Sequence, residues 1–129
     1  EKVWAEIKDF EKMSSWHPVV AQSSTDIDQD NAIGTVRTCN LEGGGVVKEV
    51  LLEHDNAKRV FSYQFLESPM PMSNAATRVE LKPITEGDQT YIEWSMGFEP
   101  DEGAENDLIE MVSGMITAGF ESLQQRLNR

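Results

Sequence analysis

Six strand-like runs, each bounded by turn residues, follow one another through the middle of the chain. We expect strands over residues 19–27, 33–41, 46–53, 59–67, 75–84 and 90–98. The segments between them are rich in Asp, Asn, Gly, Ser and Pro, and the clearest turn is Gly43-Gly44-Gly45. None of these connections has room for a helical crossover, so the pattern predicts an antiparallel meander rather than a parallel sheet.

The two ends of the chain carry helical periodicity instead. Residues 2–8 form a short amphipathic pattern that ends near Asp9, and residues 10–18 are predicted to be irregular. Residues 105–127 predict one long helix, with acidic residues at its start and Arg126 near its end, as the helix dipole favours. Its apolar residues form two adjoining stripes, a width that indicates packing against a sheet. The stripes are Leu108, Met111, Met115, Ala118 and Ser122, and Ile109, Val112, Ile116, Phe120, Leu123 and Leu127.

Length and composition limit the classes of protein to which the chain can belong. Its 129 residues suit a single domain over residues 1–129, and a hydrophobic share of 39% is ordinary for a globular protein. No apolar run approaches the roughly 20 residues that a membrane span needs. The net charge of −12 argues against nucleic acid as a partner, because the acidic surface would repel phosphate. Cys39 is the single cysteine, so no internal disulfide is expected.

The start of the sequence suggests a longer parent chain. There is no initial Met, and Val3, Trp4 and Ile7 already recur at helical spacing. We therefore expect that any targeting signal lies upstream of these residues. From the residues present, the expected location is cytoplasmic.

Turn lengths predict how the strands pair and which side chains share a face. They would pair Val79 with Met96, and they would set Glu49 opposite Cys39 on one side and Tyr63 on the other. These registers gather most large apolar side chains on one face, which the long helix can cover. The expected inward face consists of Val19, Leu51, Phe61, Tyr63, Phe65, Val79, Trp94, Met96 and Phe98, with Leu108, Met111 and Met115 from the helix.

Glu49 is the most informative polar residue on this face. It lies in mid-strand between Val47 and Leu51, where a carboxylate is costly unless it is paired. It is either a ligand anchor or general acid/base, or a structural partner of Arg37, and another register would turn it outward. Arg37 is either a clamp for a ligand carboxylate or phosphate, or the partner of Glu49.

Histidine and metal chemistry are less well defined. His17 precedes Pro18 where the chain enters the sheet, and it is either a general base or a structural hydrogen-bonding residue. His54 lies in a charged turn and is expected to be exposed. No CxxC, HxxxH or HExxH spacing occurs, so no metal site is expected. No GxGxxG or P-loop pattern occurs either, and no cofactor is expected.

Eight short strings form an ordered set along the chain. They are Val3-Trp4 through Asp9-Phe10, Trp16-His17-Pro18, Gly34-Thr35-Val36-Arg37, Glu49-Val50-Leu51-Leu52-Glu53 with Asp55, Ser62-Tyr63, Pro71-Met72-Ser73-Asn74, Trp94 with Phe98, and Ala118-Gly119-Phe120 with Leu123. In order and spacing they resemble the SRPBCC (START-like) superfamily, specifically its polyketide cyclase/dehydrase type-2 family. The resemblance covers essentially the whole chain.

The resemblance implies the α+β helix-grip fold, in which a curved antiparallel sheet wraps around a long C-terminal helix and encloses an apolar cavity. It also implies two small helices ahead of the meander. A first strand before Val3 would be missing, so we expect an N-terminally incomplete START-like domain. In this family the Gly43–Gly45 hairpin and the Pro71–Asn74 loop border the cavity mouth, where they are either a mobile lid or two surface turns.

The resemblance and the inward face together imply binding of a small hydrophobic molecule that is lipid-, polyketide- or isoprenoid-like. The residues expected to bind it are Arg37, Glu49, Tyr63, Phe61, Phe65, Trp94, Met96, Phe98, Leu108, Met111 and Met115. The alternative is a cofactor-free cyclase or dehydratase, with Glu49 and either Tyr63 or His17 as acid/base and Arg37 stabilising an oxyanion. Binding is preferred because no nucleophile–base–orienter set is found. A chaperone-like partner binder and a homodimer are retained as further hypotheses.

Overall fold

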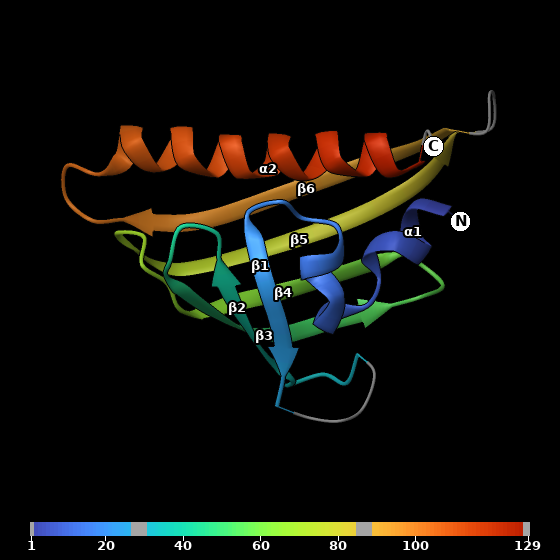
Figure 1. Cartoon of the computed structure of the whole chain (residues 1–129), viewed down its shortest axis with the longest axis horizontal. Helices are drawn as coiled ribbons and strands as arrows, with labels where there is room; N and C mark the ends of the chain where they lie inside the picture. Colours follow the sequence, from blue (N-terminus) through green and yellow to red (C-terminus); the bar gives the residue numbers. More distant parts are fainter. Residues whose placement is uncertain (1, 27–30, 85–88, 128–129) are drawn as a thin grey trace.

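The predicted meander and long helix are both present in the structure. The computed structural model describes residues 2–26, 31–84 and 89–127. In these ranges six antiparallel strands form one sheet in the order β1-β2-β3-β4-β5-β6, and Figure 1 shows the helix α2 (Glu105–Leu127) running along it. The strands are β1 (Val20–Thr25), β2 (Val36–Leu41), β3 (Val46–Asp55), β4 (Val60–Glu67), β5 (Met72–Ile84) and β6 (Gln89–Pro100). This architecture confirms the helix-grip prediction.

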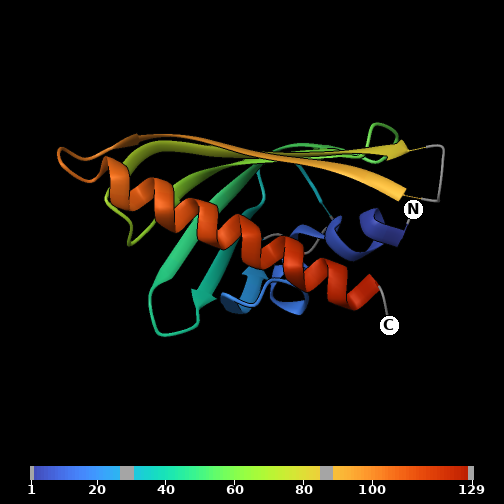
Figure 2. The same ribbon diagram turned by 90° about the horizontal axis from the view of Figure 1, so that it is seen from above.

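Two short helices precede the sheet. They are α1 (Lys2–Ile7), as predicted, and the 3₁₀-helix η1 (Phe10–Ser15), which forms in a stretch predicted to be irregular. Figure 2 shows both on the same side of the curved sheet as α2. The Ser122 hydroxyl of α2 donates a hydrogen bond to the Trp16 carbonyl oxygen, and Arg126 Nε donates to Glu6 Oε2 at 2.9 Å. The start and end of the described chain are therefore joined directly.

The turn after β3 holds α1 in place. Trp4 Nε1 donates to Asn56 Oδ1 at 3.0 Å, and His54 Nε2 lies 2.7 Å from the Lys8 carbonyl oxygen, to which it donates. The Trp4 and His54 rings are 5.5 Å apart. His54 belongs to the end of β3, and the expectation that it is exposed is wrong, because α1 packs against this end of the strand and leaves the imidazole half-buried.

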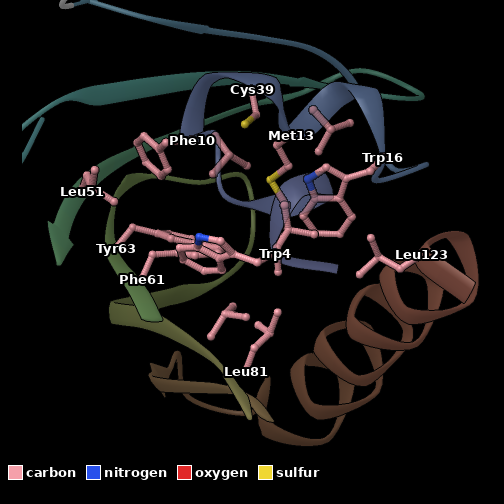
Figure 3. Packing of buried hydrophobic residues seen from close by; sticks show 14 residues of the cluster. Trp4, Phe10, Met13, Trp16, Cys39, Leu51, Phe61, Tyr63, Leu81 and Leu123 are labelled. Atoms are coloured by element: carbon pink, nitrogen blue, oxygen red, sulfur yellow. The ribbon is translucent and has the colours of Figure 1, made fainter. Parts of the chain in front are cut away.

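The hydrophobic core lies where α1 and η1 pack against the concave side of the sheet (Figure 3). The short helices contribute large side chains that a 6-residue helix could not bury alone, so the sheet stabilises them. One α2 residue, Leu123, belongs to this buried cluster. The other members are Trp4, Ile7, Phe10, Met13, Trp16, Val20, Cys39, Val47, Leu51, Phe61, Tyr63, Val79 and Leu81.

The register of the β5–β6 hairpin differs by two residues from the prediction. Val79 pairs with Trp94 rather than with Met96, and the ladder closes at Ile84 and Gln89. Because side chains alternate along a strand, a two-residue error keeps every side chain on its predicted face.

The strands around Glu49 show the same kind of difference. Glu49 pairs with Arg37 of β2 and with Phe65 of β4, not with Cys39 and Tyr63 as predicted. The pairing of β3 with β4 is irregular at two places, where Leu66 of β4 and Leu52 of β3 are extra residues, and turn lengths do not reveal such β-bulges. The observed register sets Glu49 and Arg37 directly across from each other.

The β2–β3 hairpin depends on its three glycines. Gly43, Gly44 and Gly45 have φ angles of 86°, 102° and 100°, which residues with a Cβ rarely adopt. A methyl group on Gly45 would lie 3.4 Å from Pro69 Cγ, so the hairpin tip approaches the β4–β5 loop. The idea that these two loops form a mobile lid stays a prediction.

The inward side of α2 is narrower than the sequence predicted. Leu108, Val112, Gly119 and Leu123 are buried, and they form one seam between the two predicted stripes. Met111 is 42% exposed, although it was predicted to bind ligand. The reason is geometric: a straight helix crossing a curved sheet contacts it along one line, and residues turned away from that line stay in water.

Candidate functional site

A main cavity lies between the concave face of the sheet and α2. Its volume is about 40 Å³, which is room for a few water molecules. Every strand contributes to its walls, together with η1, the segment that follows it, and α2. The predicted site residues that line it are His17, Glu49, Tyr63, Phe65, Trp94, Met96 and Met115.

The lining changes from polar to apolar along the cavity. Its polar members are all buried, and they are His17, Cys39, Glu49, Tyr63 and Thr77. Apolar members such as Leu41, Phe65, Met96 and Ile116 are only half-buried, so the cavity approaches the surface on their side. A molecule in this cavity would therefore meet apolar walls first and polar groups last.

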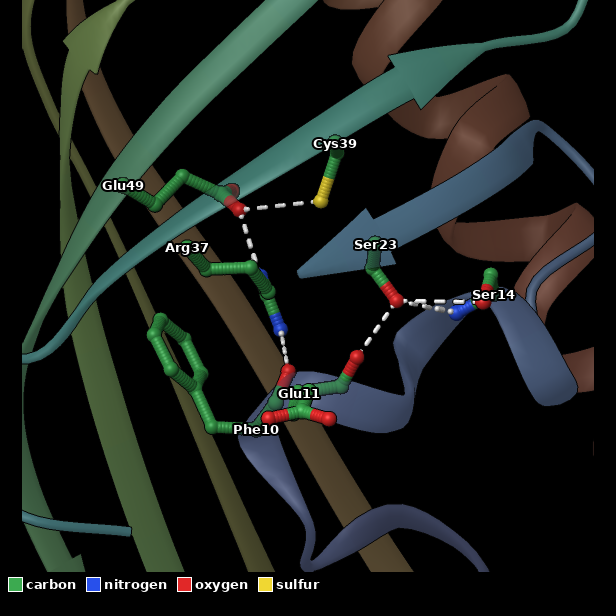
Figure 4. A network of polar contacts seen from close by, with 7 residues as sticks. All are labelled: Phe10, Glu11, Ser14, Ser23, Arg37, Cys39 and Glu49. Carbon is green, nitrogen blue, oxygen red and sulfur yellow. Dashed lines mark hydrogen bonds and ion pairs between the residues drawn. The ribbon is translucent and has the colours of Figure 1, made fainter. Parts of the chain in front are cut away.

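The buried polar end is organised by an ion pair between Arg37 and Glu49 (Figure 4). Arg37 Nε and Nη2 donate to Glu49 Oε1 at 2.9 and 2.6 Å, and only 3–4% of either side chain is exposed. The Cys39 thiol donates to the same oxygen at 3.7 Å. Each charge thus compensates the other where water is excluded. Burial of either charge alone would be strongly unfavourable.

Arg37 is also held by the residues on either side of its guanidinium. Its Cζ lies 4.0 Å from the centre of the Phe10 ring and 4.7 Å from that of Tyr63, in cation–π contact with both. Nη1 donates to the Phe10 carbonyl oxygen at 3.0 Å. All three guanidinium nitrogens therefore have acceptors within the protein. This arrangement does not favour Arg37 as a clamp for a ligand carboxylate.

The pair changes the acid–base properties of its neighbourhood. Burial opposes the charge on Arg37, but the Glu49 carboxylate outweighs it and raises the Arg37 pKa above its ordinary value. Burial raises the pKa of Cys39 to about 12, although Arg37 acts in the opposite direction. Burial also raises the pKa of Tyr63, and the nearby Glu49 charge adds to this effect. Both the thiol and the phenol are therefore protonated at neutral pH.

His17 uses both ring nitrogens within the fold. The Val19 backbone N–H donates to Nδ1 at 3.2 Å, so Nε2 carries the proton and donates to the Met115 carbonyl oxygen at 3.0 Å. Burial lowers the pKa of His17, and the hydrogen bond to Met115 only partly offsets it. His17 is thus a neutral link between the segment after η1 and the middle of α2. This geometry favours the structural interpretation over the general base.

Acidification is expected to destabilise the fold through His17. Because the folded pKa lies below the ordinary value of 6.5, the unfolded chain takes up the proton first. The stabilisation is therefore present above about pH 6.5 and is lost as pH falls through the folded pKa. Melting temperatures measured between pH 7.5 and 5.5 should fall less in His17→Gln than in the wild type. His54→Gln is the matched control, and an equal slope in all three proteins would contradict the role of His17.

A smaller side cavity adjoins the main one. Its volume is about 10 Å³, and both Arg37 and Phe61 line it. Met13, Tyr63 and Trp94 line both cavities and so form the wall between them. Because methionine side chains change rotamer readily, movement of Met13 would join the two spaces.

The remaining predicted site residues lie elsewhere. Leu108 is a buried residue of α2 and Phe98 is half-buried near the end of β6, but neither lines either cavity. Met111 also lies outside both cavities, because it is on the side of α2 that faces solvent.

Several lining residues were absent from the prediction. Thr77 lies two positions from the inward-facing Val79, so strand alternation alone could have found it. Val112 was assigned to the other stripe of α2, and its inward position depends on the rotation of the helix. Met13 lies in the 3₁₀-helix, where the sequence has no regular period that predicts burial.

Metal and membrane sites are not evident in residues 2–26, 31–84 and 89–127. Within these ranges, no group of three or more His, Cys, Asp or Glu residues is placed to hold a metal ion. Among the described residues, no helix has the length and apolar character needed to cross a membrane.

Comparison with known proteins identifies similar sequences and folds. A family model described as polyketide cyclase/dehydrase and lipid transport matches residues 1–128. The solved structure of the protein XoxI from Bacillus cereus is 26% identical, with a TM-score of 0.86 over 97% of this chain and 84% of that one. A putative uncharacterized protein from Bacillus thuringiensis is 24% identical, with a TM-score of 0.88 over 99% and 90%. A structure from Thermobifida fusca is 23% identical, with a TM-score of 0.85 over 97% and 83%. Comparison with curated proteins found no match.

Proposed function

Because the chain belongs to the polyketide cyclase/dehydrase and lipid transport family of the SRPBCC superfamily, we propose that it binds a small hydrophobic molecule in the main cavity. The observation that carries this proposal is the lining itself, in which apolar half-buried walls lead to a buried polar end. Such a combination holds an apolar body and orients it by a few polar contacts.

The state of the polar residues supports binding over catalysis. His17 has no free ring nitrogen to act as a base, and its pKa is lowered by burial. Arg37 is occupied by Glu49 and Phe10 and lines only the side cavity, so it is badly placed to stabilise an oxyanion. The Cys39 thiol, with a pKa of about 12, is a poor nucleophile at neutral pH.

The small volume of the main cavity requires it to expand around a ligand. A dry cavity that holds benzene measures about 150 Å³, several times the volume observed here. Three methionines, Met13, Met96 and Met115, line the main cavity. Their unbranched side chains can repack at low cost, so the walls can adapt to an apolar guest. Joining the side cavity would add further room.

N-phenyl-1-naphthylamine, an uncharged fluorophore that emits more strongly in apolar surroundings, is expected to bind the main cavity. Met96→Trp would place an indole in that space and should weaken binding at least about tenfold, since the guest and the indole compete for one volume. Met111→Trp is the matched control, because Met111 is 42% exposed and lies outside both cavities. Fluorescence titration measures both affinities.

Stability measurements make this test independent of fluorescence. A ligand at 100 times its Kd raises the free energy of unfolding by about 2.7 kcal/mol, which a melting curve detects. Melting without ligand must first show that both variants are folded. Equal weakening by the two substitutions, or no binding to the wild type, would contradict the proposed function. Mass spectrometry of denatured protein would identify any apolar compound that co-purifies.

A further inference from the structure

The two oxygens of the Glu49 carboxylate differ in their surroundings. Oε1 accepts from Arg37 Nε, Arg37 Nη2 and the Cys39 thiol. Oε2 accepts no hydrogen bond from the described residues, although the side chain is only 4% exposed. The fully buried side-chain atoms without a partner among the described residues are Trp16 Nε1 and Thr35 Oγ1, and Oε2 is not one of them. Part of its surface is therefore accessible, and a donor from outside the chain can reach it.

The position of Glu49 indicates where that partner would come from. Glu49 lines the main cavity, whereas its ion-pair partner Arg37 lines only the side cavity. The acceptor is thus available to a molecule in the main cavity, and the guanidinium is not. From this geometry we infer that the bound molecule carries a neutral hydroxyl group, an alcohol or phenol, which donates a hydrogen bond to Glu49 Oε2. The inference rests on the proposed function and specifies its ligand class.

Charge balance favours a neutral donor over an ion. Arg37 and Glu49 already cancel, so a ligand ammonium would add an uncompensated charge in a buried site. A ligand carboxylate would meet Glu49 without reaching Arg37, and like charges repel. A hydroxyl group adds no charge and supplies the missing donor. Its hydrogen bond to a carboxylate is also stronger than one between neutral groups.

The rest of the cavity suits the same molecule. Beside Glu49, the Tyr63 and Thr77 side chains face the main cavity from paired positions on β4 and β5. The Thr77 side chain is close enough to the Tyr63 phenol to oppose the rise in its pKa, so the two residues form a polar pair at this end of the cavity. Phe65 and Met96 then provide apolar contacts toward the surface. The ligand would therefore bind with its hydroxyl inward and its apolar body outward.

Three ligands of nearly equal shape test this inference by isothermal titration calorimetry. 4-Propylphenol has the donor, 4-propylanisole has its oxygen methylated, and 4-propylbenzoate carries a charge. The phenol is expected to bind the wild type at least about tenfold more tightly than the anisole, as loss of a hydrogen bond to a charged group predicts. The benzoate should bind most weakly. Equal affinity for phenol and anisole, or preference for the benzoate, would overturn the inference and leave an apolar binding cavity intact.

The same ligands distinguish the two proposals. If none of the three binds, the hydroxyl inference fails. The proposed function fails with it only if N-phenyl-1-naphthylamine does not bind either. Because these results come from the wild type, they do not depend on whether any variant folds.

Substitution of Glu49 tests whether its carboxylate causes the preference for the phenol over the anisole. In Glu49→Gln the preference for phenol over anisole should fall about fivefold, because a neutral acceptor replaces a charged one. Glu53→Gln is the matched control on the same strand, since its side chain is 47% exposed and lines neither cavity. If Glu49→Gln does not fold, Glu49→Gln with Arg37→Gln removes both buried charges. An unchanged preference in the folded variant would overturn the inference.

Discussion

Arg37→Met is expected to lower the free energy of unfolding by about 3–5 kcal/mol, as removing one partner of a buried ion pair does. The substitution leaves the Glu49 carboxylate in the interior without its cation, and it removes the donor that the Phe10 carbonyl oxygen uses. A domain of this size has a total stability of about 5–15 kcal/mol, so the variant would lose a large part of it. Urea unfolding followed by circular dichroism measures the change.

The control for this experiment is an exposed ion pair on the same sheet. Arg78 Nε lies 3.7 Å from Glu53 Oε1, and both side chains are nearly half exposed. Arg78→Met should change stability far less, because solvent screens this pair. A loss in Arg37→Met no greater than that in Arg78→Met would show that the buried pair does not stabilise the fold.

A double variant distinguishes the interaction between the two charges from the cost of burying one charge alone. Arg37→Met with Glu49→Leu leaves no buried charge, and such replacements are often neutral or stabilising. We expect it to be more stable than either single variant, with a coupling well above 1 kcal/mol in the double-mutant cycle. If the bound molecule donates a hydroxyl group to Glu49, the double variant would keep its fold but lose its preference for a hydroxyl group. Conservation of fold and loss of selectivity would assign ligand recognition to Glu49.

The second large effect is expected at Gly119 of α2. A methyl group on Gly119 would lie 2.8 Å from Trp94 Cζ3, closer than packed atoms allow, and 3.1 Å from His17 Cδ2, which is also a tight contact. Gly119→Ala should therefore destabilise the protein by about 1–2 kcal/mol, because overpacking exceeds the gain of about 1 kcal/mol in helix propensity. The helix approaches Trp94 and His17 this closely only because residue 119 has no side chain.

Gly114, five residues earlier in α2, provides the matched control. A methyl group there would meet nothing within 4 Å, so Gly114→Ala gains helix propensity without a clash. It should raise the free energy of unfolding by up to about 1 kcal/mol. Thermal or urea unfolding of the two variants should therefore show changes of opposite sign. A stabilised Gly119→Ala would contradict the close packing of α2 on Trp94.

The order of elements was predictable because it depends on local patterns. Alternating apolar residues marked the strands, and a period near 3.6 marked α1 and α2. The 3₁₀-helix η1 was not predicted as a helix from its residues, since it is stabilised by burying Phe10 and Met13 rather than by its own periodicity. In η1, tertiary packing therefore overrides the conformational preference of the local sequence.

The register was predictable only to the nearest two residues. Val79 pairs with Trp94 instead of Met96, and Glu49 pairs with Arg37 instead of Cys39. Turn sequences do not specify which residues form the last pair of a hairpin, and the bulges in β3 and β4 add residues that no sequence pattern shows. The predicted faces of the strands were nevertheless correct. A one-residue shift in pairing would turn the apolar side chains to solvent, whereas a two-residue shift leaves them on the buried face.

The sequence alone determined the meander, the long helix and the face of the sheet that carries Glu49, because these follow from the periods of helices and strands. Tertiary structure decided what the polar residues on that face do. It bound Arg37 to Glu49 Oε1, placed Glu49 in the wall of the main cavity, and joined His17 to Met115, 98 residues away. Hydrogen-bond partners and cavities depend on distances of a few tenths of an ångström between segments remote in sequence. Such distances arise only when the sheet curves and α2 closes over it.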